Sequence, residues 1–147
     1  MGSSAKQFGL GVLPLLIGFL YNYVILWLPV PIFLVNLAFL ILWGFLCYRV
    51  LVPGQSIPLQ LLRICLFGAV MLALALYQEL VNGSYFSGFV GLASQFYFLP
   101  GMSLCGALVS PFLDVIRPYL FYIAEYVCMC LICLATCLVK CKKKPAV

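Results

Sequence analysis

A single carboxylate, Glu125, interrupts the last long apolar stretch of the sequence. It follows Tyr119 by six positions, which corresponds to ~9 Å along a helix that rises ~1.5 Å per residue. An ionisable side chain inside a membrane span is a candidate proton carrier or cation ligand. The plainer interpretation is a shallow Glu125 that pairs with Arg117 or reaches water, and the short separation between these two residues favours it.

Four further residues complete a candidate path for an ion or ligand. Asp114 and Arg117 belong to a short charged segment before the last apolar stretch, whereas Gln95 and Pro100 lie in the apolar segment that precedes it. We expect any such path to involve these residues together with Glu125.

The sequence contains eight cysteines, and five of them lie in or just beyond the last apolar stretch: Cys128, Cys130, Cys133, Cys137 and Cys141. Cys130 and Cys133 have the C-x-x-C spacing that indicates redox chemistry in some soluble proteins. On a helix, four of the five (Cys130, Cys133, Cys137 and Cys141) form one stripe about 80° wide, with Glu125 well off it.

Three interpretations of this stripe are open. We favour the packing of small side chains between helices. S-acylation of Cys137 or Cys141 is the second interpretation, because both residues lie beside lysines where the last apolar stretch ends. Metal or thiol redox chemistry is the third. Thiols among apolar residues are inert, and the sequence has no histidine to complete a metal site.

The chain has few groups that suit catalysis. It has no histidine, and its acidic residues are Glu79, Asp114 and Glu125. General acid–base catalysis therefore has few candidates, and no glycine-rich loop that would cradle a phosphate is present. We expect a protein that is not an enzyme and that binds no cofactor or metal.

The composition indicates whether water or lipid surrounds this protein. The chain is 67% hydrophobic and 7% charged, whereas soluble domains are about one quarter charged. Eight basic and three acidic residues cannot cover the surface of a soluble fold of this length. Lipid must therefore face most of the surface.

The sequence predicts one transmembrane domain, residues 1–147, with an all-α polytopic bundle of five hydrophobic helical segments. Residues 8–50 form a hairpin of two spans that folds at Pro29 and Pro31, and a third span covers 59–80. A fourth segment occupies 85–113, the last span 118–139, and a basic tail 140–147. Each of the predicted spans is close to the ~20 residues that cross a bilayer.

The segment 85–113 fits two structures. It is uncharged and long enough to cross, but Pro100 and Gly101 interrupt it. One structure is a kinked helix, and the other is a re-entrant pair of half-helices that meet at Pro100. Non-helical backbone at membrane depth requires burial in protein or a water-filled cavity, so this segment is where we expect a ligand path.

The distribution of positive charge links the number of spans to their orientation. With four spans, Lys6, Arg49, Arg63 and the lysines of the tail share one side, and Arg117 lies alone on the other. With five spans the basic residues divide equally. The positive-inside rule therefore favours a re-entrant 85–113, whereas its length favours a fifth span. We expect the C terminus to be cytosolic.

Two asparagines occupy matching depths in the hairpin. Asn22 and Asn36 are each about seven positions from the turn, eight and six from its middle residue, Val30. An asparagine inside a span usually bonds to a neighbouring helix. We expect a hydrogen bond between Asn22 and Asn36 that fixes the hairpin.

These observations predict partners and a function class. The expected partners are the bilayer, other membrane protein subunits, and anionic headgroups at the terminal lysines Lys140, Lys142, Lys143 and Lys144. Nucleic acid is not expected, because no aromatic residues alternate with the basic ones.

The expected function is a small non-catalytic accessory or structural subunit of a membrane complex. The alternative is a small ion- or proton-coupled transporter or channel that uses Glu125 and the segment interrupted by Pro100. A thiol oxidoreductase that uses Cys130 and Cys133 is a third hypothesis.

Overall fold

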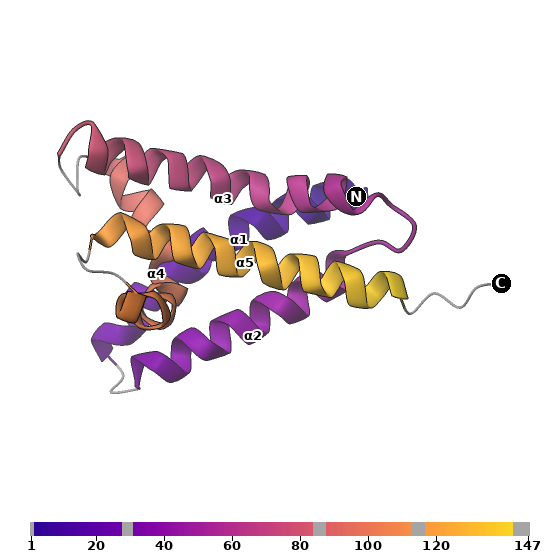
Figure 1. Ribbon diagram of the computed structural model, residues 1–147, viewed down its shortest axis with the longest axis horizontal. Helices are drawn as coiled ribbons and strands as arrows, with labels where there is room; N and C mark the ends of the chain where they lie inside the picture. The colour runs from indigo at the N-terminus through magenta and orange to yellow at the C-terminus, as the bar shows by residue number, and fades with distance from the viewer. Residues whose placement is uncertain (1, 28–30, 84–87, 113–116, 143–147) are drawn as a thin grey trace.

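The computed structural model describes residues 2–27, 31–83, 88–112 and 117–142, and within these ranges the protein is an all-α bundle (Figure 1). Its helices are α1 (Ser3–Trp27), α2 (Ile32–Val50), α3 (Ile57–Leu80), α4 (Gly88–Val109) and α5 (Pro118–Lys142). A 3-10 turn, Ser110–Phe112, follows α4. The predicted fold class is confirmed.

All five helices are long and apolar enough to cross a membrane. Their outer faces carry large exposed side chains such as Leu16 and Leu20 on α1, Ile41 on α2 and Leu62 on α3. Exposed apolar side chains on every face of a bundle are stable only against lipid. The chain is therefore an integral, multi-pass membrane protein.

Prolines define where several helices begin. Pro31 immediately precedes α2, Pro58 lies in the first turn of α3, and Pro118 is the first residue of α5. The first turn of a helix tolerates proline because its N–H groups have no intrahelical partner. Between α2 and α3 the chain reverses at Gly54, whose φ of 91° suits glycine.

Helix α4 is the central element of the bundle. It contacts each of the other four helices, and 44% of its span is buried, against 22–28% for the other helices. Glycines permit this close packing: Gly18 of α1 lies directly against the backbone of Phe96, where a Cβ atom would have no room.

Both ends of α4 lie at the same end of the bundle. Near its start, Gly91 packs against Gln78, in the last turn of α3, and near its end Gly106 packs against Phe121, in the first turn of α5. Its middle reaches deeper, because Tyr97 contacts Gly68 near the centre of α3. Figure 1 shows α2, α3 and α5 running along the long axis while α4 stays in the half where α3 ends and α5 begins.

Pro100 does not break α4. The helix continues from Gly88 to Val109 with Pro100 inside it. Of the two structures that the sequence left open, the single helix is therefore the one observed, and the pair of half-helices is excluded. A proline inside a membrane helix is tolerated because neighbouring helices compensate for the lost backbone hydrogen bond, and Pro100 is buried at the centre of such contacts.

The start of α1 and the end of α5 lie at the same end of the bundle (Figure 1). This end carries Lys6, Arg49, Arg63 and Lys140, whereas Arg117 lies at the start of α5, at the opposite end. Among the described helices, α1, α2, α3 and α5 run from one end to the other and α4 does not. This arrangement matches the charge distribution that four spans predict.

Candidate functional site

Glu125 is completely buried at the contact between α5 and α4. Its exposed fraction is 0%, and neither carboxylate oxygen has a hydrogen-bond partner within the described part of the chain. It lies against the backbone of Gly101, where a Cβ atom would come within 2.5 Å of Oε1. Arg117 is exposed at the start of α5, so the prediction of a shallow, paired Glu125 is wrong.

The periodicity of α5 explains how Glu125 becomes buried. The buried residues of this helix recur every three or four positions: Tyr122, Glu125, Met129, Cys133 and Cys137. Such spacing places side chains on one face of a helix. Glu125 therefore lies at one edge of a broad core-facing side, and Cys133 and Cys137 lie farther around the helix, about 80° and 120° from it.

Aromatic rings border the region around Glu125. Tyr97 and Phe98 contact edge to face at 4.9 Å, and Phe98 lies 5.6 Å from Tyr122 between ring centroids. The hydroxyl of Tyr97 donates to the carbonyl oxygen of Gly11 at 3.1 Å, so it is engaged away from Glu125. Within the described residues no ion pair compensates this carboxyl group, and the polar group that lies against it is the backbone of Gly101. Isolated buried charges are strongly disfavoured. Glu125 is thus suited to gain a proton or to attract a cation.

The structure brings together only some of the predicted path residues. Pro100 precedes the glycine that touches Glu125, so these two are neighbours. Gln95 lines a separate small cavity between α3, α4 and α5 with Glu79 and Tyr122; its volume is about 10 Å³, roughly the space of one water molecule. Arg117 lies apart, and Asp114 is outside the described residues.

Asn36 and Asn22 do not bond to each other. Asn36 Nδ2 donates to the Tyr21 hydroxyl at 2.8 Å. Its Oδ1 accepts from the Ser103 hydroxyl and from the Leu104 N–H, the latter at 3.0 Å. Asn36 therefore forms the predicted kind of helix–helix contact and joins α2 to both α1 and α4. Its partners are Tyr21, Ser103 and Leu104, whereas the predicted partner was Asn22.

Asn22 instead lies in a groove on the outer face of α1 and α4. Two hollows of about 270 and 320 Å³ meet there and share Leu92 and Phe96. The first is entirely apolar, whereas the second is also lined by the amides of Asn22 and Gln95. We call this continuous depression the α1/α4 groove.

A buried glutamine network at the opposite end was not predicted from the sequence. Gln7 Nε2 donates to Gln60 Oε1 at 3.1 Å, and Arg63 donates to Gln7 Oε1 at 3.3 Å. Gln60 also bonds to both backbone groups of Val52, which orders the connection from α2 to α3. The only sequence signal is that Gln60 and Arg63 are three positions apart, which places them on one face of a helix.

Lys140 and Cys137 have different environments from those predicted. The ammonium group of Lys140 donates to the carbonyl oxygens of Tyr48 and Leu51, at 2.5 and 2.6 Å. It thereby caps the C-terminal end of α2 and is not directed at lipid headgroups. Cys137 is only 2% exposed, so its position does not support acylation. The side chain of Cys141 and residues 143–147 lie outside the description.

In the described part of the chain, no group of three or more His, Cys, Asp or Glu residues is placed to hold a metal ion. The described site therefore consists of a buried carboxyl group and an amide-lined outer groove. No known protein family, no curated protein and no solved structure matches the chain.

Proposed function

We propose that this chain is an accessory subunit of a membrane complex and that a helix of its partner binds in the α1/α4 groove. The main support for this proposal is the position of Asn22, a half-buried amide on a surface that otherwise faces lipid. Hydrocarbon offers an amide no hydrogen-bond partner. A partner helix with a polar side chain would supply one.

The shape and lining of the groove support this proposal. Its apolar hollow, beside Phe19 and Phe89, offers packing area, and its amide-lined hollow offers a polar contact in register with it. Membrane helices associate through packing and through polar contacts of about 0.6–2 kcal/mol each. An amide beside an apolar hollow combines both contributions on one surface.

The orientation of the chain follows from the positive-inside rule. We infer that the bundle end carrying Lys6, Arg49, Arg63 and Lys140 faces the cytosol, because cytoplasmic ends are enriched in Lys and Arg. The C terminus would then be cytosolic, and the α1/α4 groove would open toward the half of the bundle near the other membrane surface.

Purification in mild detergent tests the subunit proposal. We expect the chain to co-purify with a stoichiometric membrane partner, and we expect Asn22→Leu to reduce the recovered partner. Leu20→Ala is the matched control, because Leu20 is exposed on the same helix and does not line the groove. Recovery of a monomer without a partner, or equal loss in both variants, would contradict the proposal.

A second candidate function rests on Glu125 alone. An ionisable group buried in a span suggests a role in moving a proton or cation, and this one has no hydrogen-bond partner in the described structure. In a small proton- or cation-coupled transporter, Glu125 would be the group that binds the proton or cation. A movement of α4, which does not traverse the bundle, would expose Glu125 for binding and release.

Reconstitution in liposomes tests this second candidate. A pH-sensitive dye or a cation-sensitive dye would report flux driven by a gradient across the membrane. We expect Glu125→Gln to abolish that flux and Glu79→Gln to reduce it less. Unchanged flux in Glu125→Gln would remove Glu125 from the mechanism.

A further inference from the structure

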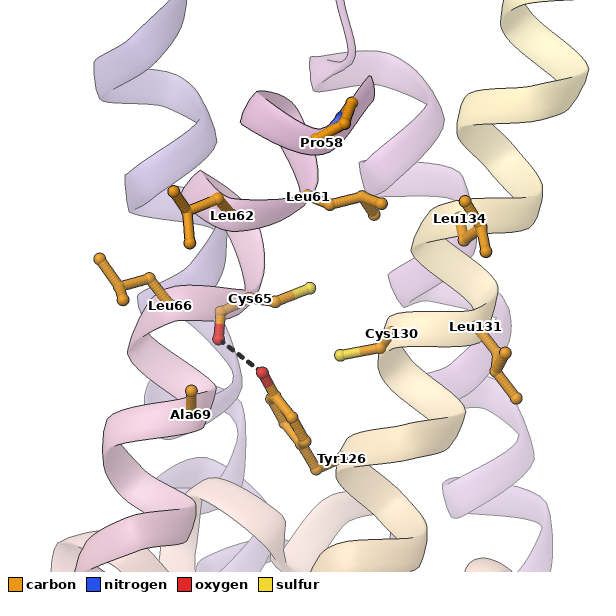
Figure 2. A pocket seen from close by; sticks show the side chains of 10 residues that line it. All are labelled: Pro58, Leu61, Leu62, Cys65, Leu66, Ala69, Tyr126, Cys130, Leu131 and Leu134. Atoms are coloured by element: carbon orange, nitrogen blue, oxygen red, sulfur yellow. Dashed lines mark hydrogen bonds between the residues drawn. The ribbon is translucent and has the colours of Figure 1, made fainter. Parts of the chain in front are cut away.

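A second groove lies between α3 and α5, on the side of the bundle shown in Figure 2. Its volume is about 430 Å³, within the ~300–1,000 Å³ of typical small-molecule sites. Most of its lining is aliphatic, and its rim residues Leu62 and Leu131 are each 58% exposed. The groove therefore opens to the hydrocarbon of the bilayer and not to water.

Two thiols face each other inside this groove. Figure 2 shows the sulfur atoms of Cys65 on α3 and Cys130 on α5 directed toward one another. The two thiols are close neighbours. Cys65 is also a neighbour of Cys133, which in turn lies near Cys47 on α2. These four thiols from three helices form a cluster of neighbouring side chains.

The arrangement differs from the C-x-x-C pair that the sequence suggests. Cys133 is fully buried, whereas Cys130 is half-buried and lines the groove. Cys65 is a neighbour of both Cys130 and Cys133. The pair that faces the groove is therefore interhelical, Cys65 with Cys130.

We propose that Cys65 and Cys130 are a redox-active dithiol, which a lipid-soluble two-electron oxidant of the quinone class oxidises while bound in the α3/α5 groove. In this reaction both S–H bonds break and one S–S bond forms between α3 and α5. The two electrons and two protons reduce the quinone to its hydroquinone. A lipid-soluble thiol reductant reverses the change by thiol–disulfide exchange.

Access and shape identify the class of oxidant. A groove that opens into hydrocarbon is reached by molecules dissolved in lipid, and water-soluble oxidants are excluded from it. A quinone ring with an apolar tail matches an aliphatic groove of this volume. Tyr126 contributes the phenolic hydroxyl beside the thiols; it donates to the carbonyl oxygen of Cys65 at 3.3 Å and is placed to turn toward a quinone oxygen.

Apolar surroundings disfavour a free thiolate, so the electrons must leave together with their protons. The two sulfur atoms are directed toward each other at the groove, so both thiol protons are available there. The reaction is a stoichiometric modification that requires no turnover. It is independent of the subunit proposal, because it involves the α3/α5 groove and not the α1/α4 groove.

The experiment uses the full-length protein, reduced and then freed of reductant in mild detergent. A short-tailed benzoquinone is added, hydroquinone formation is followed by absorbance, and the disulfide is located by mass spectrometry of peptides after blocking free thiols. We expect about one equivalent of hydroquinone per chain and a cross-link between Cys65 and Cys130, as the two-electron stoichiometry requires. Ferricyanide, which is water-soluble, should form the same cross-link at least about tenfold more slowly.

Variants separate this pair from the other cysteines. Cys65→Ser and Cys130→Ser should each abolish quinone reduction, whereas Cys128→Ser should react as the native protein does. Cys128 is the matched control because it is on α5 but lies near Cys105 of α4 and does not line the groove. Three results would each overturn the proposal: a cross-link between other cysteines, equal rates with ferricyanide, or no cross-link in the native protein. The last of these is measured on the native protein, so it does not depend on whether a variant folds.

Discussion

The carboxyl group of Glu125 on α5 lies against the backbone of Gly101 on α4, one residue after Pro100. The absence of a Cβ atom at position 101 is what makes room for the carboxyl group. This contact joins the central helix α4 to the last span at a carboxyl group that is fully buried.

Adding a methyl group at this contact should destabilise the protein. The Cβ of Gly101→Ala would lie 2.5 Å from Glu125 Oε1, and such overpacking typically costs about 1–3 kcal/mol. Thermal unfolding in detergent, followed by the exposure of buried thiols, would measure the loss. Gly9→Ala is the control, because nothing lies within 4 Å of its Cβ position. Combining Gly101→Ala with Glu125→Ala should recover part of the loss, and additive effects would contradict the contact.

Removing the carboxyl group should stabilise the bundle. Glu125 is buried without a hydrogen-bond partner in the described structure, and an unsatisfied buried polar group costs about 1–3 kcal/mol. Glu125→Leu should therefore raise the free energy of unfolding by a similar amount, about 1–3 kcal/mol. The same unfolding assay measures it. A clear loss of stability would mean that the carboxyl group has a favourable partner in the membrane.

The sequence predicts the helices well because proline and hydropathy are local signals. The second span begins and ends as predicted, at Ile32 and Val50. The first helix begins earlier, at Ser3 and not at residue 8, because Gln7 is drawn into the bundle by its bond to Gln60. That bond joins residues distant in the chain, and no local pattern encodes it.

The candidate site depends on contacts that a single segment does not determine. Glu125 is identifiable from its position in an apolar helix, but its burial depends on Gly101, in a different helix. Asn36 donates to Tyr21, the residue directly before Asn22 in α1. Asn36 therefore lies close to the level of Asn22, as the sequence predicts. One position along a helix rotates a side chain by about 100°, so matching depths do not establish which residues face each other.

The two asparagines should differ when each is replaced by leucine. Asn36→Leu removes three hydrogen bonds across helices and leaves the Tyr21 and Ser103 hydroxyls without this partner. At about 0.6 kcal/mol for each membrane hydrogen bond, we expect a loss of roughly 2 kcal/mol. Asn22→Leu should leave the stability of the isolated chain nearly unchanged. Comparable losses in the two variants would show that Asn22 also stabilises the bundle.

Lys140 should stabilise α2 as a C-terminal cap. Its ammonium group bonds to the carbonyl oxygens of Tyr48 and Leu51, and a cation near the end of a helix contributes about 0.3–1 kcal/mol when exposed and ~2 kcal/mol when partly buried. Lys140→Met should therefore lower the free energy of unfolding by about 1–2 kcal/mol, because the apolar stem remains while the donor is lost. Lys6→Met is the control, since Lys6 is exposed and lies at the same end of the bundle. Binding to vesicles with and without anionic lipid provides the complementary measurement. If Lys140 acts as a cap, Lys140→Met should lose stability and keep the preference for anionic lipid, whereas Lys6→Met should keep its stability. A loss of the preference for anionic lipid in Lys140→Met without any change in unfolding would assign this lysine to the headgroups.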